Sequence, residues 1–283
     1  MNKPMIITTQ TQVKPLLQPW VLPQTETNIQ VEIEPLPTLV EKFAPTSLAE
    51  MDAVALLNRV DTKFVMPIDQ LMEALSAVKS EYRMLEVAGH RLNHYRTLYF
   101  DTDWFDLYYL HINHRAEHYK VRSREYLDSN ISFLEVKHRT QKNRTIKDRL
   151  ATDQPITWMN DRAEQWLNGV FPFDSRRLEP RLWNTFTRLT LVNKQQCERV
   201  TIDVDLTFTW AQKSVRLDGI AVAEVKLAGL HCQSPFLVQM RKQHIHASGF
   251  SKYCVGTAML YEEVKKNSLK SRLMWIKKVT KGV

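Results

Sequence analysis

The sequence predicts an α+β fold built on a mainly antiparallel sheet, on three observations. Charged and apolar residues alternate with a period of two in five short stretches, as in strands whose successive side chains point to opposite faces. The predicted elements run strands, helix, strands, helices, which is typical of α+β domains. Only seven glycines occur, and neither GxxxxGK nor GxGxxG is present, so any phosphate must be bound by side chains. The five stretches are 120–124, 134–139, 186–189, 199–205 and 224–227.

The first half of the chain gives two helices followed by strands. Residues 1 to about 38 are rich in Gln, Thr and Pro, and we expect a poorly ordered leader. Ser47 and Glu50 form a capping box, which predicts a helix that continues to about Arg59. Leucines and a valine at helical spacing predict a second helix. The period then changes to two. The elements are a helix over 69–80 and strands over 95–101, 116–126 and 131–140.

The second half returns to strands after one helix and ends in helices. Residues 177–184 fit either a helix or an extended segment. The other elements are a helix over 161–170, strands over 186–193, 199–206, 214–217 and 221–227, and helices over 236–243 and 252–266. We therefore divide the chain into a leader (1–38), a domain (39–266) and a basic C-terminal tail (267–283).

Composition narrows the class of protein. With 283 residues, of which 43% are hydrophobic and 25% charged, the chain has the composition of a globular protein with one large or two small domains. No apolar run reaches the roughly 18 residues of a membrane helix, and the start lacks a signal-peptide core, so we expect a cytoplasmic location. Three scattered cysteines, Cys197, Cys232 and Cys254, fit neither disulfides nor a thiolate zinc site and are expected to be buried thiols.

The net charge of +8 is concentrated in the tail. From Val264 onward there are seven lysines and arginines and no acid, so the rest of the chain is close to neutral. Within the domain, residues 115–149 contain ten basic and five acidic residues. Such grouping indicates a site rather than diffuse attraction to polyanions, and it gives no reason to expect a specific nucleic-acid partner. The histidines of 111–118 lie among cations and match no zinc spacing.

The charged strand faces look either at water or at one another. In the second case the interior of the sheet is an anion-binding channel. Arginine recurs on these faces, and its planar fork suits the oxygens of an oligophosphate. Three acids lie among the cations, and carboxylates of this kind hold Mg²⁺ or Mn²⁺ together with phosphate oxygens. These acids are Glu135, Asp203 and Glu224.

Seven short motifs occur in an order that resembles the VTC domain, the polyphosphate polymerase domain of vacuolar transporter chaperone proteins. This domain belongs to the triphosphate tunnel (CYTH-like) superfamily, and the resemblance covers about residues 40 to 265. The motifs are Arg59–Phe64, Tyr99–Thr102, Lys120–Arg124, Glu135–Lys137, the Arg188 strand followed by Arg199–Asp203, Glu224–Lys226 and Ser251–Tyr253.

The resemblance implies an antiparallel β-barrel tunnel with a polar interior, flanked by helices. Arg59 and Lys63 would come from the first helix, at one mouth. Residues implied in catalysis are Lys63, Arg122, Arg124, Lys137, Arg188, Arg199, Lys226 and Lys252, the last from the C-terminal helix. Residues implied in substrate binding are Arg59, Lys120, Arg139, Tyr99 and Ser251. The outer face, covered by helices, would be formed by Val121, Leu134, Val136, Val200, Ile202, Val204, Val225 and Leu227.

The family's reaction transfers the terminal phosphoryl group of ATP to a growing polyphosphate chain. The implied partners are therefore ATP and inorganic polyphosphate, and the implied cofactor is Mn²⁺ or Mg²⁺, held by Glu224, with Glu135 and Asp203 either supporting it or orienting cations. Two alternatives stay open. One is hydrolysis of tripolyphosphate or a nucleoside triphosphate, with Glu135 or Asp203 as base. The other is a polyphosphate-binding protein without activity.

Two further features bear on these alternatives. Tunnel triphosphatases open with Glu-x-Glu-x-Lys on a strand, whereas Glu32 and Glu34 are followed by Leu36, and Pro35 interrupts a strand. This departure favours a polymerase over a hydrolase.

The tail is expected to be a solvated, partly helical extension, and its apolar residues 273–276 among lysines also fit a peripheral membrane contact or a membrane-protein partner.

Overall fold

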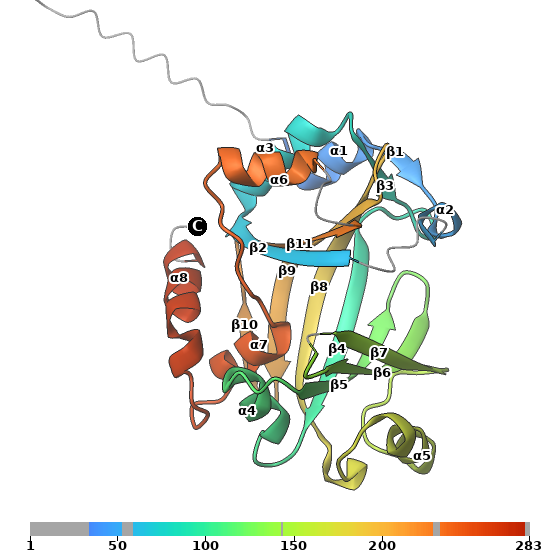
Figure 1. The fold of residues 1–283 in the computed structure, drawn as a ribbon, viewed down its shortest axis with the longest axis vertical. Helices are drawn as coiled ribbons and strands as arrows, with labels where there is room; N and C mark the ends of the chain where they lie inside the picture. Colours follow the sequence, from blue (N-terminus) through green and yellow to red (C-terminus); the bar gives the residue numbers. More distant parts are fainter. Residues whose placement is uncertain (1–33, 53–58, 143, 229–232, 281–283) are drawn as a thin grey trace, which may run out of the picture. The chain divides into compact units, whose positions relative to one another are not determined.

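A computed structural model describes residues 34–52, 59–142, 144–228 and 233–280. Figure 1 shows their helices and strands. The strands are β1 (Ala44–Thr46), β2 (Arg59–Pro67), β3 (Tyr82–Leu85), β4 (Asn93–Asp101), β5 (His118–Tyr126), β6 (Ile131–Arg139), β7 (Thr145–Thr152), β8 (Glu179–Asn193), β9 (Glu198–Trp210), β10 (Lys213–Arg216) and β11 (Ile220–Ala228). The α-helices are α1 (Leu36–Glu41), α2 (Leu48–Asp52), α3 (Ile68–Val78), α4 (Asp106–Ile112), α5 (Asp161–Val170), α6 (Pro235–Lys242), α7 (Lys252–Leu260) and α8 (Lys270–Thr280), with short 3₁₀ turns η1 (Ser175–Arg177) and η2 (Asn267–Leu269).

The strands form one sheet in the order β2-β11-β9-β8-β4-β5-β6-β7, with β1, β3 and β10 attached at its margins. All pairs are antiparallel except β1 with β3. The predicted mixed fold with a large antiparallel sheet is therefore confirmed. In the described residues β2 and β7 do not pair, so the sheet is open and the closed barrel is not confirmed.

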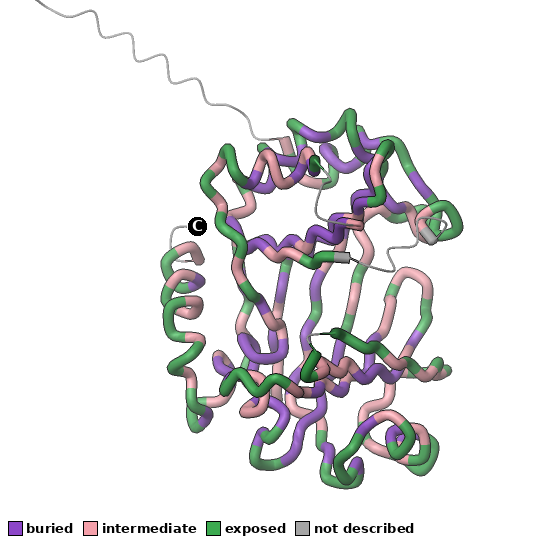
Figure 2. Tube along the Cα trace, in the orientation of Figure 1, coloured by how far each residue is buried: buried purple, intermediate pink, exposed green. Residues whose placement is uncertain are grey.

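One face of the sheet is apolar and covered by helices, as the period-two pattern predicts. The eight side chains expected on this face are all at most 7% exposed. Those from β9 and β11 pack with the apolar sides of α3 and α6, and those from β5 and β6 pack with α5. Buried segments follow these strands in Figure 2. Burial of apolar surface thus fixes which way the intervening charged residues point.

The opposite face is charged over only part of its area, which corrects the expectation of a wholly polar interior. Helix α7 packs against β8, β9 and β10, and with Phe186, Leu206 and Phe208 it forms a third apolar cluster. The close approach depends on Gly256, because a Cβ there would lie 2.6 Å from the Phe208 ring. A helix that the sequence placed beside the sheet therefore fills part of its inner face.

Strand β2 replaces the end of the first predicted helix. The capping box is present, since the Ser47 amide donates to Glu50 Oε2 at 2.8 Å, but α2 ends at Asp52. Arg59–Pro67 instead pairs along its whole length with β11. Its alternate residues Phe64 and Met66 are buried under α1 and α3. The expectation that Arg59 and Lys63 come from a helix was therefore wrong.

Several other elements differ from the sequence prediction or were not predicted at all. Strand β7 carries no apolar alternation, because it is an exposed edge strand paired with β6. Helix α4 begins where the buried Asp101 carboxylate accepts hydrogen bonds from the amides of Leu107 and Tyr108. Residues from Glu179 onward are extended, and α7 ends at Leu260. Helix α1 begins at Leu36, within the segment assigned to the leader.

The cysteine prediction holds for one of the two described residues. Cys254 is buried in α7, whereas Cys197 is exposed in the turn before β9. Cys232 lies outside the described residues. No helix in the described part of the chain is long and apolar enough to cross a membrane.

We expect Gly256→Ala to destabilise the fold by about 1–3 kcal/mol, because the new methyl group must displace a fully buried ring. Chemical denaturation measures this change. Gly169→Ala in α5 is the matched control, since its Cβ meets nothing within 4 Å and alanine favours the helix. Equal stability changes in the two variants would contradict the packing of α7. Adding Phe208→Leu to Gly256→Ala should restore part of the loss.

Candidate functional site

The charged face of the sheet is organised around three acids, two buried and one partly exposed, each bound by two cations. Because paired strands place directly opposite residues on one face, the register brings these charges together, within the β5–β6 and β8–β9 hairpins and between β2 and β11, which are distant in the sequence. The three groups are Arg188–Asp203–Lys252, Arg122–Glu135–Lys147 and Lys63–Glu224–Lys226. The charged side chains of these strands therefore contact one another and are not only exposed to water.

The first group joins β8, β9 and α7. Arg188 and Asp203 lie opposite each other and form a bidentate pair, with Nε–Oδ1 at 2.6 Å and Nη2–Oδ2 at 2.8 Å. Lys252, the first residue of α7, binds Oδ2. Burial raises the pKa of Asp203, but Arg188 and Lys252 lower it more, so the pKa lies well below its usual range. The acid is ionised and holds both cations in place.

Two aromatic rings lie under the cations of this group. Tyr95 and Phe186 stack with centroids 5.0 Å apart. The Lys252 ammonium lies 4.3 Å from the Phe186 centroid, and the Arg188 guanidinium lies 5.1 Å from that of Tyr95. Arg124 lies over the same two rings. The rings attract the cations while excluding water from one side, which keeps the charges available to a ligand on the other.

The second group joins β5, β6 and β7. Arg122 Nη2 lies 2.7 Å from Glu135 Oε2, and Lys147 binds the other carboxylate oxygen. Although burial raises the pKa of Glu135, Arg122 and its neighbours lower it far more. Burial also lowers the pKa of Lys147 to about 8. The sequence prediction did not single out Lys147, because β7 shows no alternation, and only its place in the basic group 115–149 could have pointed to it. In the structure it lies opposite Lys137.

The third group joins β2 and β11. Glu224 lies opposite Lys63 and binds it through one oxygen, while Lys226 binds the other. Burial raises the pKa of Glu224, but the two lysines lower it to well below its usual range. The Glu224 side chain is 20% exposed, compared with 0% for Glu135 and 5% for Asp203. It is the acid that a hydrated ion can reach most easily.

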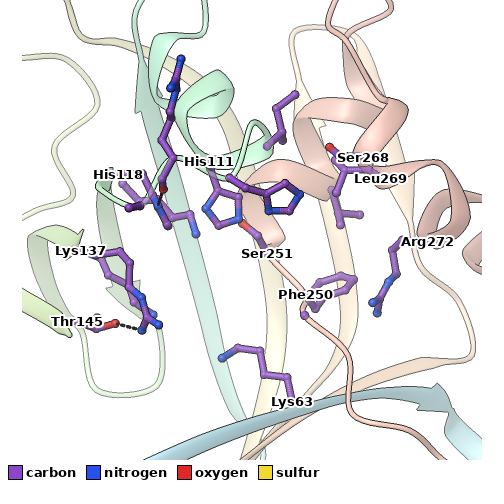
Figure 3. A pocket seen from close by; sticks show the side chains of 18 residues that line it. Lys63, His111, His118, Lys137, Thr145, Phe250, Ser251, Ser268, Leu269 and Arg272 are labelled. Carbon is purple, nitrogen blue, oxygen red and sulfur yellow. Dashed lines mark hydrogen bonds between the residues drawn. The ribbon is translucent and has the colours of Figure 1, made fainter. Parts of the chain in front are cut away.

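A cavity of about 570 Å³ opens beside these groups (Figure 3). Its lining in the described residues contains six lysines and arginines and three histidines, but no acid. The basic residues are Lys63, Arg115, Lys120, Lys137, Arg139 and Arg272, and the histidines are His111, His114 and His118. Such a lining binds anions.

Lys120 and Lys137 make the cavity electrostatically incomplete. They lie opposite each other on β5 and β6, and no carboxylate in the described part of the chain forms an ion pair with either. Burial, with Lys120, Lys63 and Arg122 nearby, lowers the pKa of Lys137 to about 7, and burial also lowers that of Lys120. Two half-buried ammonium groups side by side without an ion-pair partner are costly unless an anion binds them.

Two of the three histidines, His111 and His118, add polar surface rather than charge. The rings of His111 and His118 meet edge to face at 4.6 Å. Burial and the neighbouring cations lower the pKa of His111 to about 2, and burial lowers that of His118, so both are neutral at pH 7. No group of three potential metal ligands exists among the described His, Cys, Asp and Glu residues.

The remaining predicted residues take varied positions. Arg139 lines the cavity and donates to Thr145 Oγ1 at 3.3 Å. Arg199 shares a face with Lys226, its partner across β9 and β11. Tyr99 is 3% exposed and stacks on Tyr253, a packing position. Ser251 lines the cavity and caps α7 by accepting from the Cys254 amide.

Arg59 and the N-terminal acids are described only in part. Arg59 is the first residue of β2, in register with Ala228. Glu34 precedes α1 and pairs with Lys42, and Glu32 lies outside the described residues. Arg272, which does line the cavity, was assigned by the sequence prediction to a solvated tail.

The chain is similar to one protein family and to several solved structures. The family model of the VTC domain matches residues 58–261. No curated protein matches the sequence. Similar solved structures include a putative adenylate cyclase from Bacillus halodurans (12% identity, 68% of this chain and 93% of that one, TM-score 0.42). Another is a putative adenylyl cyclase from Hippeastrum with a dominant triphosphatase activity (15% identity, 72% and 98%, TM-score 0.43).

Binding of tripolyphosphate at pH 8 is expected to be accompanied by proton uptake, with Lys137 gaining up to about one proton. The cavity without an anion lowers the pKa of Lys137 to about 7, and phosphate oxygens nearby raise it again. Titration calorimetry in buffers of different ionisation enthalpy measures the uptake. Lys137→Arg is the matched variant, since arginine stays charged at this pH and should remove that part of the uptake. Identical uptake in the two proteins would show that Lys137 does not receive the anion.

Proposed function

We propose, from the premise that this chain belongs to the VTC domain family, that it is a polyphosphate polymerase. It transfers the terminal phosphoryl group of ATP to a growing inorganic polyphosphate chain, in a tunnel whose wall is the charged face of the sheet. The observation that carries the proposal is the cavity, whose lining contains two half-buried lysines without an ion-pair partner and no acid among the described residues. A polyanion is the ligand that this cavity is built to accept.

The cations of the site fall into two sets with different roles, those held in place by acids and those without an acidic partner. Arg122, Arg188 and Lys252 are fixed by acids, so their donors are already oriented before a ligand arrives. Lys120 and Lys137 carry uncompensated charge that a phosphate chain neutralises. Phosphoryl transfer spreads negative charge over the transferred group while the attacking and leaving oxygens lie in line. Fixed cations on several sides of that group stabilise this state without rearranging.

A divalent ion fits this site through one acid. Glu224 is the most exposed of the three carboxylates, and Mg²⁺ or Mn²⁺ needs only one or two carboxylates when phosphate oxygens supply other ligands. When bound, the ion would neutralise phosphate charge. Glu135 and Asp203 are enclosed by their cations, so we assign them the positioning of Arg122, Arg188, Lys147 and Lys252 instead.

The same geometry argues against hydrolysis. A hydrolase needs a base to activate water, and Glu135 and Asp203 were the candidates. Both are held by two cations and have pKa values far below neutral, so they are poor proton acceptors. A polyphosphate end is already an oxyanion near neutral pH, so its attack needs no base.

Incubation of the purified protein with ATP and Mn²⁺, with and without a short polyphosphate primer, tests the proposal. We expect ADP and a lengthening ladder of polyphosphate on a gel. Release of free phosphate without a ladder would identify a hydrolase. Tight binding of tripolyphosphate without turnover would identify a binding protein.

Glu224→Gln is expected to reduce turnover by at least about a hundredfold while the protein stays folded, because the neutral amide cannot hold a divalent ion and no longer orients Lys63 and Lys226. The rate of ADP formation and thermal unfolding measure the two effects. Glu262→Gln, at an exposed carboxylate, is the control and should match the original protein. Full activity in Glu224→Gln would remove Glu224 from the site.

A further inference from the structure

Helix α8 is not a free tail but a packed element next to the cavity. Ile276 is 1% exposed, and Leu273, Trp275 and Val279 pack on the same apolar cluster as α7. Three of the four apolar residues in 273–276 are thus used within the protein, and Met274 alone of them is exposed, at 62%. The lysines at 270, 277 and 278 face solvent. This packing fixes the direction of another side chain of the helix, Arg272.

Arg272 points from α8 into the wall of the cavity (Figure 3). Its Nη1 donates to Ser248 Oγ at 3.0 Å, and the Ser248 amide donates to the carbonyl of Lys63 at 2.8 Å. In the described part of the chain no carboxylate pairs with Arg272. The guanidinium is half-buried and uncompensated, as Lys120 and Lys137 are.

Arg272 and Lys137 lie on opposite sides of the cavity, with Lys63 between them (Figure 3). Lys137 comes from β6 and Arg272 from α8, so a chain of linked phosphates that extends across the cavity can contact both more readily than a single orthophosphate. The family match ends at residue 261, so this cation comes from a segment outside the matched domain. The two sides of the cavity are therefore supplied by different parts of the chain.

We propose that Arg272 binds an extended phosphate chain, as a substrate-binding residue that the segment after the VTC domain adds to the cavity. The inference rests on the proposed function. Its consequence is selectivity for length: a long polyphosphate contacts Arg272 and the Lys120–Lys137 side together, while orthophosphate contacts one side only. Since Ser248 holds the guanidinium in place, little side-chain entropy is lost when the chain binds.

The test measures affinities of the full chain for long-chain polyphosphate and for orthophosphate at several salt concentrations. Arg272→Gln should weaken binding of the long chain about tenfold and flatten its salt dependence, while orthophosphate binding and thermal stability stay unchanged. Ser248→Ala tests for a merely structural role and should keep at least most of the affinity. Lys278→Gln, at a solvent-facing position of the same helix, should bind as the original protein does.

Each other outcome overturns the inference. Unchanged long-chain affinity in Arg272→Gln removes the residue from the site. An equal loss of affinity in Arg272→Gln and Ser248→Ala, accompanied by an equal loss of thermal stability, shows that Arg272 only supports β2. An equal loss of affinity in Lys278→Gln shows diffuse attraction to the basic helix. Failure of the original protein to bind any polyphosphate overturns the proposed function as well. By contrast, a polymerase in which Arg272→Gln is neutral refutes this inference alone.

Discussion

The structure depends on one electrostatic constraint: cations from six strands and a helix face one another on the same side of a sheet, where water screens them poorly. Two like charges about 4 Å apart repel by about 4 kcal/mol at an intermediate effective dielectric constant. The fold tolerates this because each of Glu135, Asp203 and Glu224 lies between two cations. The compensation is incomplete, and the excess positive charge at Lys120 and Lys137 is left for a ligand.

This division between compensated and uncompensated cations links folding to function. Acid-bound arginines are held in fixed orientations, which costs stability through burial. Under the proposed function the same orientation prepares them for phosphate oxygens. The uncompensated lysines supply the driving force for anion entry. The outer face contributes indirectly, because the packing of Val200, Ile202 and Val225 under α3 and α6 prevents a slip in register that would turn the charges outward.

Sequence patterns predicted the strands of the charged face well, because one apolar and one charged face leave a clear period of two. They failed where that signal is absent or ambiguous. Strand β7 is an exposed edge, so Lys147 went unnoticed. The residues before Phe64 were expected in a helix, but in the structure they form a strand because they pair with β11. Arg272 could not be placed, since its position depends on how Ile276 and Trp275 pack against distant residues. The position of α7 on the inner face of the sheet likewise depends on one close contact, between Gly256 and Phe208.

A crystal structure with bound tripolyphosphate tests the central claim most directly, that the incomplete compensation of charge on the inner face exists to bind a phosphate chain. The account predicts phosphate oxygens within hydrogen-bonding distance of the Lys120 and Lys137 ammonium groups, with the Arg188–Asp203 and Arg122–Glu135 pairs intact. Tripolyphosphate bound only to the exposed lysines of α8, with the cavity filled by water, would contradict it.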